Sequence, residues 1–247
     1  MTHTPATTAS SPATPANAHR FEREFLPPLS LVLVRHGVTD MTSAQLLSGS
    51  GVDGPPLSAA GRVQAAKAAD AIYRIGRGTW ERVPKASRIV ASPMARTQET
   101  AATIGRRLGV KVETDERVRE IHFGDWEGLT AEQTIERDGD AILRWQDGDV
   151  AAPGGESIAD VVARAREFLD SLAAAHAHLP TAADGAIVVV SHAVAIKALV
   201  GAAMGFPTDR VSRIWPIPAS LTIVQLRVTP TGELAEAHTL CIGAPTD

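Results

Sequence analysis

The stretch that decides the fold is LVLVRHG at residues 31–37. Its four aliphatic residues form a short apolar run, which predicts a buried strand. Arg35 and His36 follow at once and are therefore expected at the carboxyl end of that strand. The pattern returns in AIVVVSH at residues 186–192, where His192 follows the most hydrophobic run of the chain. Two core strands are thus predicted to end on a histidine.

Strand and helix patterns alternate through the rest of the chain. Further strands are predicted at 88–91, 110–112, 221–227 and 233–242, and helices at 58–74, 93–108, 157–176 and 194–204, with one or two short helices in 130–146. Ser92 is expected to cap the helix that Gly109 ends, and Ser157 with Asp160 is typical of a capping box. The alternation predicts an α/β fold of three layers: a mostly parallel central sheet with helices on both faces, and a final hairpin.

The expected organisation is one domain behind a tail. Residues 1–28 are rich in Thr, Ala and Pro, which predicts a disordered segment, and residues 29–247 form the domain. The tail lacks the charged start and apolar core of a signal peptide, and no run is long enough for a membrane helix. A single cysteine, Cys241, suits a reducing compartment. We therefore expect a cytoplasmic protein without a membrane contact.

Charge and composition exclude other classes of protein. The net charge is −4 and the pI about 6.1, which argues against binding to a nucleic-acid backbone. The sequence shows no cluster of cysteines or carboxylates for a metal, so no metal or cofactor is expected. The last two strands would offer an edge for a dimer, but the oligomeric state cannot be read from the sequence.

The candidate chemistry lies at the strand ends. Ligands of open α/β sheets bind beyond the carboxyl ends of the strands, so His36 and His192 are expected to face one crevice. A third strand ends before Ser92, and Arg96 follows in the first helical turn, where backbone N–H groups and a guanidinium suit an anion. Each residue alone would be read as an ordinary loop histidine or a solvated arginine. Their combination favours anion binding.

Five motifs, in this order, resemble those of the histidine phosphatase superfamily, the phosphoglycerate-mutase-like proteins. They are Arg35-His36-Gly37, Ser92 with Arg96 and Thr100, EIHFGDWEG at 120–128, PGGES at 153–157, and Ser191-His192. The resemblance covers about residues 30–242. Within the superfamily, the pattern looks most like α-ribazole phosphatases and like an acid phosphatase domain that some actinobacterial proteins fuse to ribonuclease H. No ribonuclease part is expected, because only a low-complexity tail precedes Leu31.

The resemblance implies roles for particular residues. The implied catalytic residues are His36 as the nucleophile, Glu120 as the proton donor and acceptor, and His192. The implied phosphate- and substrate-binding residues are Arg35, Arg96, Thr42, Ser48 and Gly49. Thr42 stands where many members carry asparagine. The segments 126–128 and 154–155 are interpreted as structural.

The implied activity is that of a metal-independent acid phosphatase. It would hydrolyse a small phosphorylated metabolite through a phosphohistidine on His36, with charge supplied by Arg35, Arg96 and a protonated His192, and with an acidic to neutral pH optimum. Two alternatives stay open. Phosphoglycerate mutase-type transfer is disfavoured because residues 129–152 lack paired arginines. A catalytically inactive module that binds phospho-ligands is disfavoured because Glu120 is retained.

Overall fold

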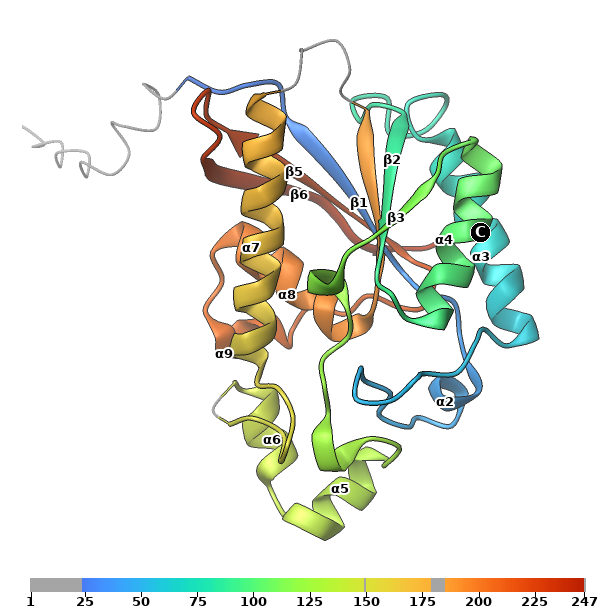
Figure 1. Ribbon diagram of the computed structural model, residues 1–247, viewed down its shortest axis with the longest axis vertical. Helices are drawn as coiled ribbons and strands as arrows, with labels where there is room; N and C mark the ends of the chain where they lie inside the picture. Colours follow the sequence, from blue (N-terminus) through green and yellow to red (C-terminus); the bar gives the residue numbers. More distant parts are fainter. Residues whose placement is uncertain (1–23, 149, 179–184, 247) are drawn as a thin grey trace, which may run out of the picture.

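The computed structural model describes residues 24–148, 150–178 and 185–246. Its centre is a six-stranded sheet in the order β3-β2-β4-β1-β5-β6 (Figure 1). The strands are β1 (Leu29–Arg35), β2 (Ala86–Ala91), β3 (Val112–Thr114), β4 (Ala186–Ser191), β5 (Leu221–Val228) and β6 (Leu234–Ala244). Strand β5 is antiparallel to both of its neighbours, and the pairings β1–β4, β2–β4 and β2–β3 are parallel. The predicted α/β class is confirmed, with a mixed sheet.

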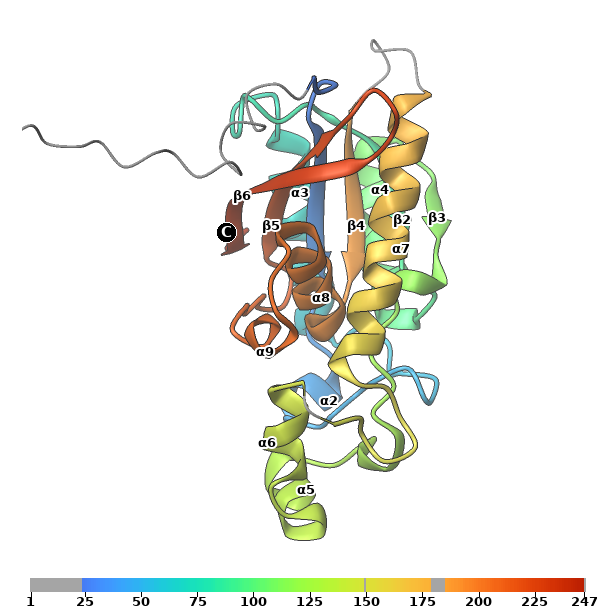
Figure 2. The same ribbon diagram turned by 90° about the vertical axis from the view of Figure 1, so that its left-hand side faces the viewer.

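Helices cover both faces of the sheet (Figure 2). Helices α3 (Ala59–Arg74) and α4 (Ala95–Leu108) lie on one face, and α7 (Ile158–Ala177) and α8 (Ala193–Met204) lie on the other. Because successive strand side chains point to opposite faces, Leu31 and Leu33 of β1 join the core under α7 and α8. The intervening Val32 and Val34 join the core under α3 and α4. Burial on both faces explains the unbroken apolar run of β1.

A lobe lies beyond the carboxyl ends of the parallel strands (Figure 1). Its elements are α2 (Asp40–Ser43), the 3₁₀ turn η3 (Gly124–Trp126), α5 (Ala131–Asp138) and α6 (Ala141–Gln146), with α9 (Thr208–Val211) beside it. A further 3₁₀ turn, η2 (Glu116–Val118), packs against α7. The Trp126 indole is fully buried, and its N–H donates to Asp138 at 2.6 Å. The Trp145 ring meets the Trp126 ring edge-on, with the ring centroids 6.3 Å apart. These contacts join η3, α5 and α6 within the lobe.

The helix ends agree with the sequence patterns except at one position. Ser157 and Asp160 form the predicted capping box of α7, and Gly109, at φ 71°, ends α4 in the left-handed conformation. The N-cap of α4 is Met94, however, and not Ser92. The Ser92 hydroxyl has a stronger partner, because it lies 2.7 Å from a ring nitrogen of His192. The predicted cap at Ser92 is therefore wrong.

The described chain begins inside the segment expected to be a tail. Leu26 donates its amide to the carbonyl of Val228 at 2.9 Å, and the Pro27 carbonyl lies 2.9 Å from Nε2 of His176. Residues 1–23 of that expected tail lie outside the described residues. In the part of the chain that the structure describes, no helix is both long and apolar enough to cross a bilayer.

Candidate active site

The ends of three neighbouring strands place the two predicted histidines together. Arg35 pairs with Ser191 in the β1–β4 ladder, and the His36 amide donates to the Ser191 carbonyl at 3.0 Å. The imidazole rings of His36 and His192 consequently stand edge to face, with centroids 5.1 Å apart. On the other side of β4, the Ser92 amide donates to the carbonyl of Val190 at 3.0 Å. The strand ends therefore form one row, as the sequence predicted.

Arg96 joins this row from the first turn of α4. Its Nε lies 3.2 Å from His36 Nε2 and 3.2 Å from His192 Nδ1, so one N–H faces both rings. Its Nη2 donates to the carbonyl oxygens of Ser48 at 3.0 Å and Gly49 at 3.4 Å. The side chain is 1% exposed. A side chain at Gly54 would collide with Arg96 Nη1, so this glycine gives the guanidinium its room.

The hydrogen bonds of His36 fix the position of its proton. Nδ1 lies 2.7 Å from the Gly37 carbonyl oxygen, which can only accept, so Nδ1 carries the hydrogen. The lone pair of the neutral ring is then on Nε2, next to Arg96. Burial, with a smaller contribution from Arg96, holds the pKa of His36 well below 6.5. The residue thus presents a neutral imidazole with its lone pair on Nε2.

The surroundings of His192 disfavour the protonated ring that the resemblance implied. Burial, followed by the charge of Arg96, holds the pKa of His192 well below 6.5. Because Nδ1 faces the Arg96 N–H donor, Nε2 carries the hydrogen and donates to the Ser92 hydroxyl. His192 is fully buried and is not among the described residues that line the adjacent cavity. Its direct contacts are with Arg96, His36 and Ser92.

A cavity of about 470 Å³ opens beside His36. Arg35, Ser48 and Arg96 line it, and each keeps a buried polar atom without a hydrogen-bond partner in the described chain: Arg35 Nε, Ser48 Oγ and Arg96 Nη1. Unpaired buried polar groups cost folding free energy. Arg35 is anchored by its Nη1, which donates to the Pro216 carbonyl at 3.0 Å. Unpaired buried polar groups on three residues that line the cavity with His36 suit the oxygens of an oxyanion.

The side chain of Glu120 lies in the same cavity, against the first turn of α8. Its Oε1 accepts from the amides of Ile121 at 3.0 Å and Ala195 at 3.1 Å, and its Oε2 accepts from the amide of Val194 at 3.2 Å. A carboxylate suits this place, because the first amides of a helix lack partners within the helix. The side chain is 5% exposed and lines the cavity with His36.

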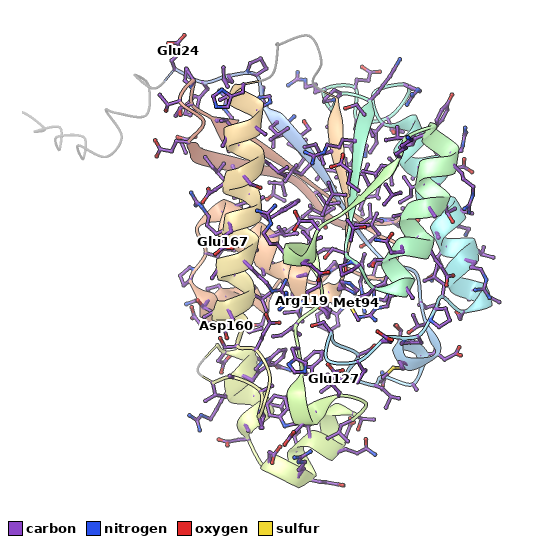
Figure 3. The ribbon with its side chains drawn as sticks, in the orientation of Figure 1. Glu24, Met94, Arg119, Glu127, Asp160 and Glu167 are labelled. Carbon is purple, nitrogen blue, oxygen red and sulfur yellow. The ribbon has the colours of Figure 1, made fainter. Side chains whose placement is uncertain are left out.

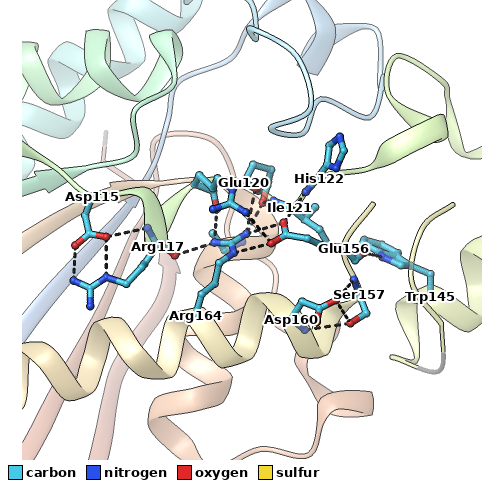
Figure 4. Close-up of polar contacts among 12 residues, drawn as sticks. Asp115, Arg117, Glu120, Ile121, His122, Trp145, Glu156, Ser157, Asp160 and Arg164 are labelled. Carbon is cyan, nitrogen blue, oxygen red and sulfur yellow. Dashed lines mark hydrogen bonds and ion pairs between the residues drawn. The ribbon is translucent and has the colours of Figure 1, made fainter. Parts of the chain in front are cut away.

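An ion pair holds the segment that carries Glu120 (Figure 4). Arg164 of α7 donates to the carbonyl oxygens of Arg117 and Arg119 at 2.8 Å and of Glu120 at 3.2 Å. Its Nε also bonds Glu156 at 3.1 Å, and Glu156 accepts the His122 amide at 2.9 Å. Both charged side chains are mostly buried, so the backbone on each side of Glu120 is fixed. The PGGES motif thus positions Glu120 through Glu156.

Glu127 joins the two loops that border the cavity. Its carboxylate accepts from the amides of Gly49 at 2.8 Å, Gly51 at 3.1 Å and Phe123 at 3.2 Å. The residue lies where the lobe meets the strand ends (Figure 3). These bonds agree with the structural interpretation of residues 126–128. They also bring Gly49 and Ser48 against Arg96.

The remaining predicted site residues, Thr42, Ser48 and Gly49, differ in how they face the cavity. Thr42 lines the cavity, but its hydroxyl is 3.0 Å from that of Thr39, the N-cap of α2. Ser48 lines the cavity with a free hydroxyl. The carbonyl oxygen of Gly49 accepts a hydrogen bond from Arg96 Nη2. In the described ranges, no group of three or more His, Cys, Asp or Glu side chains could hold a metal ion.

The prediction missed several residues around this site. Ser92 was read as a helix cap rather than as the partner of His192, and Gly54 had no signal in the sequence. Lys197 and Trp215 also line the cavity. Trp215 lies in the loop after α9, and no motif points to it.

The fold and the site together define an α/β protein with a cavity at the carboxyl ends of its strands that is lined by a histidine, two arginines and a glutamate. A family model described as "Histidine phosphatase superfamily (branch 1)" matches residues 31–233. The chain therefore belongs to the histidine phosphatase superfamily, as the motifs implied.

Individual relatives agree with this membership. The chain is 36% identical over 189 residues to a glucosyl-3-phosphoglycerate phosphatase of Mycobacterium tuberculosis, with 75% of this chain and 78% of that protein covered. It is 34% identical over 200 residues to a protein of Mycobacterium tuberculosis named as bifunctional, with 80% of this chain covered, and it spans about half (50%) of that relative. It matches a solved structure of a mycobacterial glucosyl-3-phosphoglycerate phosphatase with inorganic phosphate at a TM-score of 0.74 and 31% identity, covering 88% of this chain and 98% of that one.

Proposed function

We propose that the protein is a phosphomonoesterase that hydrolyses a small phosphorylated metabolite through a phosphohistidine on His36. The observation that carries the proposal is the position of His36, whose lone pair is on Nε2, in one cavity with Arg35, Ser48 and Arg96, each of which keeps a buried polar atom without a partner in the described chain. Membership of the superfamily and the phosphatase names of relatives support it. The solved relative with inorganic phosphate shows that a protein of this fold binds that anion.

The first step forms one bond and breaks another. His36 Nε2 attacks phosphorus in line, while the bond from phosphorus to the ester oxygen breaks. Arg35 and Arg96 bind the phosphoryl oxygens, and Arg96 exchanges its contact with His36 for one with the phosphoryl group. Glu120, in its acid form, gives its proton to the departing oxygen. The products are phosphohistidine, the free alcohol and an ionised Glu120.

The second step restores the enzyme. Water attacks the phosphohistidine, Glu120 takes a proton from that water, and the bond between nitrogen and phosphorus breaks to release phosphate. In this proposal His192 is a positioning residue, because it touches Arg96 and His36 and not the cavity. The lowered pKa of His36 keeps its ring neutral below pH 6.5, so activity is expected to persist at acidic pH.

The test is phosphate release from 4-nitrophenyl phosphate in the presence of EDTA. Wild type is expected to turn over, and His36→Ala is expected to lose at least about 10³-fold in kcat, since the nucleophile is removed. The matched control is His238→Ala, an exposed histidine on β6, which should keep the wild-type rate. Acid-labile, base-stable labelling of wild type by a radioactive substrate would identify the phosphohistidine. Equal rates for wild type and His36→Ala would refute the nucleophile assignment.

The same assay addresses the alternatives. An inactive binding module would release no phosphate from any ester. A mutase would transfer the phosphoryl group within phosphoglycerates faster than it releases inorganic phosphate. We expect release of inorganic phosphate to be the faster reaction.

A further inference from the structure

Ser92 is held in place by its own backbone. The residue follows β2 directly and is fully buried. Its amide donates to the Val190 carbonyl of β4 at 3.0 Å. Its carbonyl oxygen accepts from Thr97 Oγ1 at 2.9 Å and from Gln98 Nε2 at 2.7 Å. Three hydrogen bonds thus fix the peptide groups of Ser92, and the hydroxyl keeps little freedom beyond rotation about χ1.

The Ser92 hydroxyl has two polar neighbours. His192 Nε2 lies 2.7 Å from Oγ, and the Met94 amide donates to Oγ over a long 3.5 Å. The other ring nitrogen, His192 Nδ1, lies 3.2 Å from Arg96 Nε, which can only donate its hydrogen. The neutral ring therefore carries its hydrogen on Nε2. Because a serine oxygen can accept two hydrogen bonds, Ser92 Oγ is the acceptor for both neighbours.

This tautomer of His192 decides what Arg96 meets. With the ring hydrogen on Nε2, Nδ1 presents a lone pair to the Arg96 N–H, which also lies 3.2 Å from His36 Nε2. With the ring hydrogen on Nδ1, two donors would face each other across 3.2 Å. Both groups are buried, so an unpaired donor there would cost free energy, and the guanidinium would turn away from the rings.

The surroundings of His192 offer no second acceptor for Nε2. Within the described ranges, the hydrogen bonds of the ring are those with Arg96 Nε and Ser92 Oγ. The ring is fully buried and is not among the described residues that line the cavity, so water from the cavity does not reach it. Removal of the Ser92 hydroxyl would leave Nε2 without an acceptor and reduce the preference for this tautomer.

We propose that Ser92 is a positioning residue of the reaction, whose hydroxyl oxygen accepts the Nε2 hydrogen of His192 and so keeps Nδ1 as the acceptor that aligns Arg96 with His36. The inference rests on the proposed function, which assigns Arg96 to the phosphoryl oxygens. Ser92 itself is not among the described residues that line the cavity. Its effect reaches the phosphoryl group through two side chains, those of His192 and Arg96.

The first test is the tautomer of His192, measured by NMR on protein with ¹⁵N-labelled histidine. A ring nitrogen that carries a hydrogen and one that carries a lone pair differ in chemical shift. Wild type is expected to show the His192 hydrogen on Nε2, with the signals assigned by their loss in His192→Gln. Ser92→Ala should move the population toward the form with the hydrogen on Nδ1. Ser92→Thr, which keeps the hydroxyl, should restore the wild-type pattern.

The second test measures how well Arg96 is aligned. Ser92→Ala is expected to lose about 10–10²-fold in kcat on 4-nitrophenyl phosphate, as displaced catalytic groups do. Calorimetry should show a Kd for inorganic phosphate about tenfold higher, the size of one charged hydrogen bond. The matched control is Thr97→Val, which removes a buried hydroxyl that bonds the Ser92 carbonyl and not His192. It should lower the melting temperature, keep the His192 tautomer and change kcat by less than about threefold.

The outcomes separate this inference from the proposed function. An unchanged His192 tautomer in Ser92→Ala, or losses of kcat of equal size in Ser92→Ala and Thr97→Val, would overturn the role of Ser92. A wild-type protein that releases phosphate from no ester would refute the proposed function instead. The tautomer and the Kd for inorganic phosphate would still test Ser92 in that case, because neither measurement needs turnover.

Discussion

The residues that line the cavity come from two parts of the chain, and we name these two groups of residues the phosphate end and the alcohol end. The phosphate end is made by the strand termini of β1, β2 and β4, where the backbone ladder sets each residue within a narrow range. The alcohol end is made by the lobe of α5 and α6, by one face of α8 and by the loop after α9. In the proposed function, the sheet holds the group common to all phosphate esters, and peripheral elements hold the part that differs between substrates. Each of the following predictions tests this division.

The largest expected effect is at the phosphate end. Arg96→Lys keeps a positive charge but removes the planar fork that contacts two histidines and the Ser48 carbonyl. We expect kcat/KM to fall by about 10²–10³-fold for every ester, the usual loss for one transition-state donor. Steady-state kinetics on an aryl phosphate will measure this. Arg106→Lys, in the last turn of the same helix, is the control, and a loss below about tenfold would contradict the division.

The next effect concerns stability, because the phosphate end buries two neutral histidines. The pKa values of His36 and His192 are lowered on folding, so below pH 6.5 the unfolded chain binds more protons than the folded one. The free energy of unfolding should therefore fall as pH drops below 6.5, by up to about 2.7 kcal/mol per pH unit for two groups. Urea unfolding between pH 7 and pH 5.5 measures the slope.

Variants identify the source of that slope. The double variant His36→Gln with His192→Gln should show a shallower dependence on pH than wild type. His238→Gln should keep the wild-type slope, because the residue is exposed. Stability that stayed constant or rose as the pH fell through this window would contradict the neutral histidine pair.

A smaller effect is expected where the α7 ion pair positions Glu120. Glu156→Gln weakens the bonds to Arg164 and to the His122 amide. We expect kcat to fall about tenfold with KM within about twofold, since a displaced acid–base group affects chemistry more than binding. Asp160→Asn, in the capping box of α7, should lower the melting temperature without this split. Changes of equal size in KM and kcat would contradict the positioning role of Glu156.

The smallest effect is expected at the rim of the alcohol end. Gln146 of α6 lines the cavity at an exposed position of the lobe. Gln146→Ala should change kcat/KM by less than about threefold for esters of any alcohol, as at most surface positions. A tenfold loss on an aryl phosphate would show that the lobe contributes to phosphate chemistry.

Sequence alone was sufficient for the phosphate end. An apolar run that ends in a histidine specifies both a buried strand and the edge where its last residue lies, so His36 and His192 were placed correctly. Arg96 followed from a helix that begins at the same edge. Ser92 was misassigned because its local pattern suits a helix cap, whereas its hydroxyl bonds a histidine 100 residues away. The protonated His192 that the resemblance implied is disfavoured, because burial beside Arg96 lowers the pKa of the ring.

The alcohol end had no comparable signal. Lys197 lies on a helix whose other residues are mostly apolar core, and Trp215 lies in an irregular loop. Their proximity depends on how α8 and the loop after α9 pack, which no local pattern encodes. Residues that act through tertiary packing were therefore found only in the structure.

The contact between Glu120 and α8 gives this residue a role in stability as well as its proposed role in catalysis. Its carboxylate is bound by the first amides of the helix, and removing such an acceptor costs about 1 kcal/mol. A descendant that had lost catalysis would still gain stability by keeping this glutamate, so selection for the fold alone is enough to preserve it. Arg96 differs, because its buried Nη1 has no hydrogen-bond partner in the described chain and so costs stability, while only its Nε and Nη2 hold neighbouring groups. The presence of such an arginine is therefore a better record of selection for an anionic ligand.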